Sequence, residues 1–235
     1  MNNETLLILS LFLCYGLVLT WYTIFGVRGL MAWMVFASIA ANIEVMVLVD
    51  AFGMPQTLGN VMFASTFLAT DIISETSGKK QAIRGVNAGI LASASFILVS
   101  QLWLCFTPSP EDFIFPHIEA VFSQTPRIMF VGLAVFALVQ HFDVWAYHKW
   151  WEFTEKHFGS RSRMLWMRNN FSTLVSQVVN TILFTVGAFG GVYELSILVS
   201  IALASYAIFV VTTLADTPFL YLARSIHQKR RNRID

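Results

Sequence analysis

The sequence predicts an all-α protein, a polytopic bundle of six to seven transmembrane helices. Of its 235 residues 56% are hydrophobic and only 12% are charged, and the mean hydropathy is +0.64. A soluble domain has about twice that share of charged residues, so lipid is expected to be the main solvent. Apolar runs of about 20 residues, the length that a bilayer core requires, also recur along the chain.

Seven apolar windows are the candidate spans. They are residues 5–25, 30–52, 58–76, 86–106, 128–148, 169–189 and 195–222. No Lys or Arg precedes the first window, as it would in a secretory signal peptide, so this window is expected to remain as a helix. Merging or dropping the first windows gives six spans. The last window contains Pro218, which is expected to kink it or to end it as an interfacial helix.

The basic residues predict the orientation. With seven spans, fourteen of the fifteen Lys and Arg residues fall on one side, and only Arg127 lies opposite. Cytoplasmic loops are enriched in Lys and Arg, so this side and the C-terminus are predicted to be cytoplasmic. Residues 1–222 then form a single transmembrane domain and residues 223–235 a basic cytoplasmic tail. The net charge of +1 argues against nucleic acid as a partner.

Other chemistries find little support in the sequence. The patterns HExxH, GxSxG and GxxxxGK[ST] are absent, so ATP would have to be used by another polypeptide. Cys14 and Cys105 lie inside apolar runs without metal or redox spacing and are expected to be packing residues. We therefore expect a protein that is not an enzyme and that holds no cofactor and no metal.

Charged residues inside the windows identify the candidate site. An ionised side chain at bilayer depth costs about 2.5–3.5 kcal/mol on insertion scales, so it usually faces a cavity or a partner. The first and fourth windows carry no charge and are expected to be scaffold. Of the carboxylates in the second window, Glu44 lies deeper in the bilayer. Asn42 points to the helical face nearly opposite to that of Glu44. Glu44 is either a site residue or a buried structural hydrogen-bonding group.

The third window ends in LATDIISETSGKK, in which Asp71, Ser74 and Glu75 share one helical face. Asp71 has no obvious local partner and is expected to line a site. Glu75 is a weaker candidate, because an i, i+4 pair with Lys79 would explain it.

Two further aspartates are candidates. The segment QHFDVWAYHKWW places Asp143 where it would lie near the inner mouth of a pathway. Its aromatic residues are expected to form an interfacial belt, with a stacking role as the alternative. They are Trp145, Tyr147, Trp150 and Trp151. Asp216 precedes Pro218, and its alternative role is as a structural partner for Arg224 or for the sixth helix.

The sixth window carries a polar stripe on an otherwise apolar helix. Its members are Asn169, Thr173, Ser176, Gln177 and Asn180. Such residues often join membrane helices by hydrogen bonds, but three amides and two hydroxyls on one face exceed what this role needs. A ligand-facing stripe is therefore favoured.

Three ordered segments resemble the signatures of the queuosine precursor transporter family, a vitamin-uptake-like family of small bacterial membrane proteins. They are LATDIISETSGKK, the segment from Asp143 to Lys149, and RNNFSTLVSQ. The similarity runs from about Ala40 to the seventh window. One position departs from the family pattern, which usually carries Asp where this chain has Asn180. An amide cannot bind a proton or form a charge-assisted bond as a carboxylate can.

The resemblance implies import of a 7-deazaguanine base, in cyano or aminomethyl form, across the bacterial inner membrane for tRNA modification. Asp71 or Glu44 would then accept from the donor edge of the base, and Gln177 or Asn180 would bind its carbonyl. The predicted substrate-binding set is Glu44, Asp71, Glu75, Asp143, Gln177, Asn180 and Asp216. The expected partners are a purine-like small molecule and the lipid bilayer, with an energising partner or a homo-oligomer as further possibilities.

Three other functions stay open at this stage. One is a substrate-binding subunit of a separate ATP-driven uptake complex. Another is an intramembrane enzyme acting on a lipid or isoprenoid, although no paired nucleophile or metal cluster supports it. The third is a purely structural membrane subunit, which would tolerate alanine at the buried polar positions.

Overall fold

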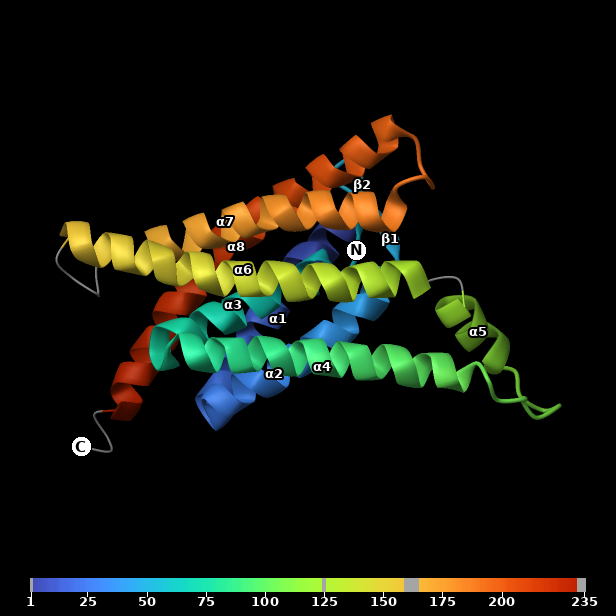
Figure 1. The fold of residues 1–235 in the computed structure, drawn as a ribbon, viewed down its shortest axis with the longest axis horizontal. Coiled ribbons are helices and arrows are strands. Elements are labelled where there is room, and N and C mark those ends of the chain that lie inside the picture. The colour runs from blue at the N-terminus through green and yellow to red at the C-terminus, as the bar shows by residue number, and fades with distance from the viewer. Residues whose placement is uncertain (1, 124–125, 159–164, 232–235) are drawn as a thin grey trace.

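The computed structural model describes residues 2–123, 126–158 and 165–231. Within them, seven long helices and one short helix form an elongated bundle (Figure 1). The helices are α1 (Asn3–Phe25), α2 (Val27–Glu44), α3 (Asn60–Ser77), α4 (Lys79–Trp103), α5 (Phe115–Ser123), α6 (Pro126–Phe158), α7 (Leu165–Phe184) and α8 (Leu195–Arg231). A π-helical segment, η1 (Thr185–Phe189), continues α7. This architecture confirms the all-α prediction.

The helices differ in how well they suit a bilayer. Five of those in the described residues are long and apolar enough to cross a membrane. They are α1, α4, α6, α7 with η1, and α8. The chain is therefore a multi-pass membrane protein, whereas the count of six to seven spans stays a prediction. Helix α8 passes through Pro218 and continues to Arg231, so the described part of the predicted tail is helical.

Helix α3 lies at the centre of the bundle. Every residue from 64 to 74 is buried, so no face of this stretch is left for lipid. It packs against α1, α2, α4, α6 and α8. A helix enclosed by other helices can carry polar side chains on all its faces. This explains why α3 is less apolar than the five helices that suit a bilayer.

A β-hairpin replaces the end of the second predicted span. Strands β1 (Leu48–Ala51) and β2 (Met54–Thr57) pair antiparallel, with Leu48 opposite Thr57. The predicted helix over residues 30–52 is therefore wrong beyond Glu44. The turn needs a positive φ at both central residues, and Phe52 and Gly53 adopt values of 55° and 72°. Pro55 cannot donate a backbone hydrogen bond and so disfavours continuation of the helix.

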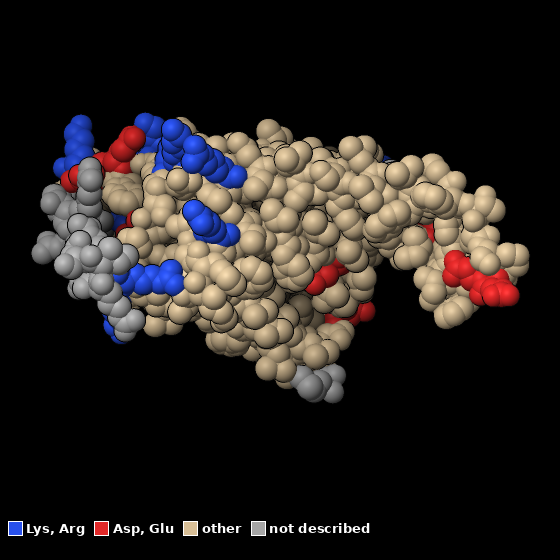
Figure 2. Space-filling view, turned by 90° about the horizontal axis from the view of Figure 1, so that it is seen from below, with Lys and Arg blue, Asp and Glu red and all other residues tan. Residues whose placement is uncertain are grey.

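The charged residues divide the molecule along its long axis. Figure 2 shows Lys and Arg gathered at one end, while a group of acidic side chains occupies the opposite tip. The basic end holds the C-terminal parts of α6 and α8 and the beginnings of α4 and α7 (Figure 1). Arg127 lies at the other end, where its side chain donates to the carbonyls of Gly187 and Gly190 at 2.8 and 2.7 Å. Charge thus separates along the axis as the sequence predicts.

Candidate functional site

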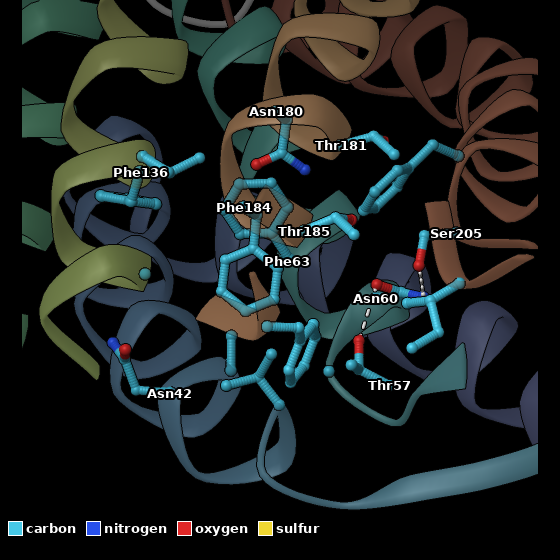
Figure 3. Close-up of a pocket in the computed structure, with 18 of the residues that line it drawn as sticks. Asn42, Thr57, Asn60, Phe63, Phe136, Asn180, Thr181, Phe184, Thr185 and Ser205 are labelled. Atoms are coloured by element: carbon cyan, nitrogen blue, oxygen red, sulfur yellow. Dashed lines mark hydrogen bonds between the residues drawn. The ribbon is translucent and has the colours of Figure 1, made fainter. Parts of the chain in front are cut away.

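A cavity lies in the half of the bundle that carries the β-hairpin, between α2, α3, α6, α7, η1 and α8 (Figure 3). Its empty space, counted together with the open space at its mouth, is about 680 Å³. Its aromatic wall consists of Phe63, Phe136, Phe184, Phe189 and Phe209. Its polar groups are Ser38, Asn42, Thr57, Asn60, Asn180, Thr181, Thr185 and Ser205. We call it the amide cavity after its three asparagines; none of its described lining residues is charged.

Two of these asparagines are held by their amide nitrogens. Asn42 Nδ2 donates to the Ser38 carbonyl at 2.7 Å and to Ser93 Oγ at 3.2 Å. Asn180 Nδ2 donates to Gln177 Oε1 at 3.1 Å. Each amide is thereby oriented by the protein, and its Oδ1 atom is left as an acceptor. The cavity thus presents acceptors from two opposite walls, α2 and α7 (Figure 3).

The third asparagine belongs to a hydrogen-bonded chain on the remaining wall. Asn60 Oδ1 accepts from Thr57 Oγ1 at 2.9 Å, and Asn60 Nδ2 donates to Ser205 Oγ at 3.4 Å (Figure 3). This chain joins β2, α3 and α8, so the hairpin helps to build the cavity. Nearby on α7, the buried Thr181 hydroxyl has no hydrogen-bond partner in the described part of the chain. It is therefore available to a ligand.

Phe63 is the centre of the aromatic wall. Its ring lies 6.0 Å from Phe136 and 6.1 Å from Phe209 between centroids, and 5.3 Å from Phe67 below the cavity. Aromatic faces with fixed amide acceptors suit a flat heteroaromatic ligand whose edge carries N–H donors. A neutral ligand is favoured, because the cavity offers a buried cation no carboxylate among the described lining residues.

Three aspartates form a second polar region, one from each of α3, α6 and α8. Asp71, Asp143 and Asp216 are at most 1% exposed. Asp71 interacts electrostatically with both of the others, and Asp216 with Asp143, so we treat them as one carboxyl cluster. Thr173 Oγ1 donates to Asp71 at 3.4 Å, and Asn169 Nδ2 donates to Asp216 at 2.6 Å.

Asp143 differs from its two neighbours in the carboxyl cluster. The hydroxyls of Thr173 and Ser176 lie beside it, but neither carboxyl oxygen accepts a hydrogen bond of normal geometry from the described residues. Asp143 therefore lies deep in the bundle with its acceptors unused, rather than at an inner mouth.

A third region contains a buried ion pair near the basic end. Arg168 Nη2 contacts Glu75 Oε2 at 2.5 Å, Tyr147 donates to the same oxygen at 3.0 Å, and Arg224 Nε lies 3.7 Å from Oε1. The Arg168 guanidinium also lies 4.4 Å from the ring centroid of Trp151. We call these residues the ion-pair cluster. Helix α7 thus meets the ion-pair cluster at Arg168, the carboxyl cluster at Thr173 and the amide cavity at Asn180.

Two local predictions about this third region are wrong. Glu75 does not pair with Lys79, because α3 ends at Ser77, between the two residues. Gly78 then changes the direction of the chain with a φ of 80°. Tyr147 does not belong to an exposed belt, since it is completely buried against Glu75. Both errors arise from contacts between helices that are far apart in the sequence.

The predicted site residues separate into several environments. Asn180 lines the amide cavity, and Gln177 lies next to it as its hydrogen-bond partner. Asp71, Asp143 and Asp216 meet in the carboxyl cluster, and Glu75 lies in the ion-pair cluster. Glu44 is half-buried at the end of α2 and lines neither the cavity nor the clusters. Every member of the predicted stripe on α7 is buried.

Sequence reasoning missed several important residues. Asn60 and Thr57 were overlooked because they lie at the edge of an apolar window, and the hairpin that positions them was not predicted. Arg168 was counted as a loop cation, although its side chain is fully buried. Its position one residue before the polar stripe was the available signal. The aromatic wall had no signal, since phenylalanine is common in all the spans.

Comparison with known proteins gives two matches. Residues 57–223 match the family model described as "Putative vitamin uptake transporter". The chain is also 34% identical over 226 residues to a protein of Bacillus subtilis (strain 168) named "Probable queuosine precursor transporter", covering 96% of each chain. No solved structure gives a significant match. The resemblance expected from the three sequence segments is therefore confirmed.

Proposed function

The chain belongs to the vitamin uptake transporter family of membrane transporters, and on this premise we propose that it imports a queuosine precursor, the uncharged cyano form of 7-deazaguanine, through the amide cavity. The name of the Bacillus subtilis relative supports this substrate class. The observation that carries the assignment is the pair of oriented acceptors, Asn42 Oδ1 and Asn180 Oδ1, beside five phenylalanines.

The fit between cavity and base is chemical. A guanine-like base carries N–H donors on its pyrimidine edge and on its pyrrole nitrogen, which point in different directions and match amide oxygens on two walls. Its flat ring matches the aromatic wall. The carbonyl of the base requires a donor, and the unpartnered Thr181 hydroxyl supplies one. The residues that we propose to bind the base are therefore Asn42, Asn60, Phe63, Asn180 and Thr181, rather than the buried acids.

The cavity's neutrality supports the cyano form over the aminomethyl form. The aminomethyl group carries an ammonium ion, and burying a cation without a counter-charge is costly. We expect the aminomethyl base to compete for binding about tenfold or more weakly than the cyano base. Competition with a radiolabelled cyano base on the purified protein measures this difference, and equal competition by the two bases contradicts it.

We infer the membrane orientation from the basic end, which we assign to the cytoplasmic side of the bacterial inner membrane. The C-terminus is then cytoplasmic, and the amide cavity lies in the half where an incoming base arrives. Labelling of single cysteines tests this assignment. Native Cys105 is the exposed cysteine in the loop after Trp103, and Lys229→Cys is made in a chain whose Cys14 and Cys105 are replaced. Only the loop cysteine is expected to react with an impermeant reagent in intact cells.

The function is tested in a strain that can neither make queuosine precursors nor import them. Expression of this chain is expected to restore queuosine in tRNA when the cyano base is supplied. Asn42→Ala and Asn180→Ala should lower this restoration, whereas Asn87→Ala, at an exposed site on α4, should not. Unchanged queuosine with and without the chain contradicts the proposal.

A further inference from the structure

We propose that the carboxyl cluster carries a proton that drives import, so that one base and one H⁺ enter together. This inference rests on the proposed import function and adds the driving ion to it. The proton binds a carboxylate of the cluster from the outer side and is released to water on the cytoplasmic side. No covalent bond of the base changes, and both charge and mass are conserved.

The first argument is the uncompensated charge of the cluster. Within residues 2–123, 126–158 and 165–231, none of the three aspartates takes part in a salt bridge, and the buried Arg168 contacts Glu75 instead. An unpaired ion at bilayer depth is costly, and neighbouring carboxylates oppose each other's ionisation. Three aspartates that interact in one buried cluster are therefore unlike a purely structural ion pair and need at least one bound cation.

The second argument is a set of acceptors without donors. Neither oxygen of Asp143 accepts a hydrogen bond of normal geometry, and Asn169 Oδ1 also has no partner among the described residues. Asn169 is fully buried, and its Nδ2 donates to Asp216, so its free oxygen lies at the cluster. Buried acceptors are normally satisfied. A proton bound at Asp143 turns one of these unsatisfied acceptors into a donor.

A proton explains the site better than a metal ion. No group of three or more His, Cys, Asp or Glu side chains in the described chain could hold a metal. The titratable groups that interact with the cluster from its neighbours are Tyr15 on α1, Glu75 on α3 and Tyr147 on α6. Arg168 on α7 and Arg224 on α8 are the nearby cations, and both contact Glu75. Tyr15 donates to the Thr212 carbonyl and Tyr147 to Glu75, so both hydroxyls are engaged elsewhere.

The position of the cluster suits coupling. Along α7, Thr173 beside the cluster and Asn180 in the amide cavity are seven residues apart, about 10 Å along the helix axis. Helix α8 likewise carries Ser205 in the cavity and Asp216 in the cluster. Two helices therefore contribute to both sites, so a movement that exposes the base to the cytoplasm also moves the proton site.

Transport by the purified full-length chain in liposomes tests the proposal. With an alkaline interior, we expect the cyano base to accumulate about tenfold for a pH difference of about one unit, the limit for one proton per neutral solute. Asp143→Asn should abolish accumulation yet retain exchange of internal for external base, which requires no net proton movement. The matched control Asp50→Asn, an exposed acid on β1, should retain both.

Two outcomes of this experiment overturn the proposal. One is uptake by the unaltered chain that stops at equal internal and external concentrations of the base despite a pH gradient, which indicates facilitated diffusion. The other is accumulation driven only by a sodium gradient. Retained exchange in Asp143→Asn also shows that the variant is folded, and Asp216→Asn provides a second variant if the first is unstable.

Infrared spectroscopy separates this proposal from the proposed function, because it needs no substrate. A protonated carboxyl group absorbs apart from a carboxylate, and we expect this band at neutral pH to be weaker in Asp143→Asn but unchanged in Asp50→Asn. If the band is present and the cyano base is not exchanged, the substrate assignment fails while the proton site stands. If exchange occurs without such a band, the proton site is wrong.

Discussion

The amide cavity and the carboxyl cluster are both polar regions inside an apolar bundle, and they solve the problem of buried polarity in different ways. In the cavity the asparagine nitrogens donate to the protein, and the unused groups are neutral acceptors. In the cluster three acids converge, and neither oxygen of Asp143 accepts a hydrogen bond of normal geometry from the described residues. A neutral acceptor is a place for a hydrogen-bonding solute, whereas a buried, unpaired carboxyl is a place for a cation.

Helix α7 contributes polar side chains to both regions. The presence of buried polar side chains therefore does not by itself identify a binding site in a membrane protein. On this helix Thr173 contacts Asp71 of the carboxyl cluster, and Asn180 lines the amide cavity. Further toward the basic end, Arg168 neutralises Glu75, which is the buried acid with a cation within reach in the described part of the chain. The three polar regions along α7 therefore differ in charge. The ion-pair cluster holds an acid with a cation, the carboxyl cluster holds acids without one among the described residues, and the amide cavity is neutral.

The largest effect is expected where a buried carboxylate loses its closest cation. Arg168→Met retains the apolar stem but leaves Glu75 buried without its closest cation. Loss of one partner of a buried ion pair costs about 3–5 kcal/mol of stability. The unfolding midpoint of the detergent-solubilised protein measures this loss. Arg84→Met, at an exposed position on α4, should leave the midpoint nearly unchanged.

A second substitution shows whether the charge is responsible. In the double variant Arg168→Met with Glu75→Gln, the unpaired carboxylate is gone, and most of the lost stability should return. A double variant that is as unstable as Arg168→Met alone would mean that the packing of Arg168 on Trp151 matters more than the ion pair.

A second large effect is expected when a carboxylate is placed in the neutral amide cavity. Asn180→Asp introduces an acid within the wall of the amide cavity. A charge-assisted hydrogen bond contributes about 1.5–3 kcal/mol, so preference should shift toward the aminomethyl base by about 10- to 150-fold. Competition binding with both bases measures the shift. An unaltered preference would show that Asn180 does not contact the substituent that distinguishes them.

Sequence reasoning predicted the apolar helices, the charge division and the individual acids, because these depend on composition and on periodicity within one helix. It did not predict which polar residues meet. Asp71, Asp143 and Asp216 come from three helices, and Arg168 reaches Glu75 across 93 positions of sequence. Glu75 was assigned to its near neighbour Lys79 because only local partners are visible in a sequence.

The hairpin was missed for a related reason. Residues 45–57 are apolar enough to extend a span, and only the turn at Phe52 and Gly53 with Pro55 signals a strand pair. Thr57 and Asn60, which build one wall of the cavity, were therefore not considered. Asn180 was visible in the sequence as part of the stripe on α7, whereas the wall that holds Thr57 and Asn60 depended on this unpredicted turn.

A smaller effect is expected from the aromatic wall. Phe63→Leu keeps an apolar side chain of similar reach but removes the ring at the centre of the wall. Loss of ring stacking costs about 0.5–1.5 kcal/mol, so the cyano base should bind about 2- to 13-fold more weakly. The dissociation constant measures this change. Phe36→Leu, on the exposed face of α2, is the matched control and should bind normally.

The smallest effect tests the amide acceptor itself, and it separates affinity from stability. Gly132 on α6 lines the cavity, and a Cβ atom added there would lie 3.2 Å from Asn42 Oδ1 and 3.8 Å from the Phe184 ring. Gly132→Ala should therefore crowd the acceptor and weaken binding of the cyano base a few-fold. Because alanine is a better helix former by about 0.8–1 kcal/mol, the same variant should be no less stable.

Gly16→Ala on α1 supplies the comparison, since a Cβ atom there meets nothing within 4 Å. It should gain stability in the same way without any change in affinity. Binding by Gly132→Ala that equals binding by Gly16→Ala would show that Asn42 Oδ1 does not face the base. The acceptors would then be confined to α7, and the neutral region would bind its ligand from one wall instead of two.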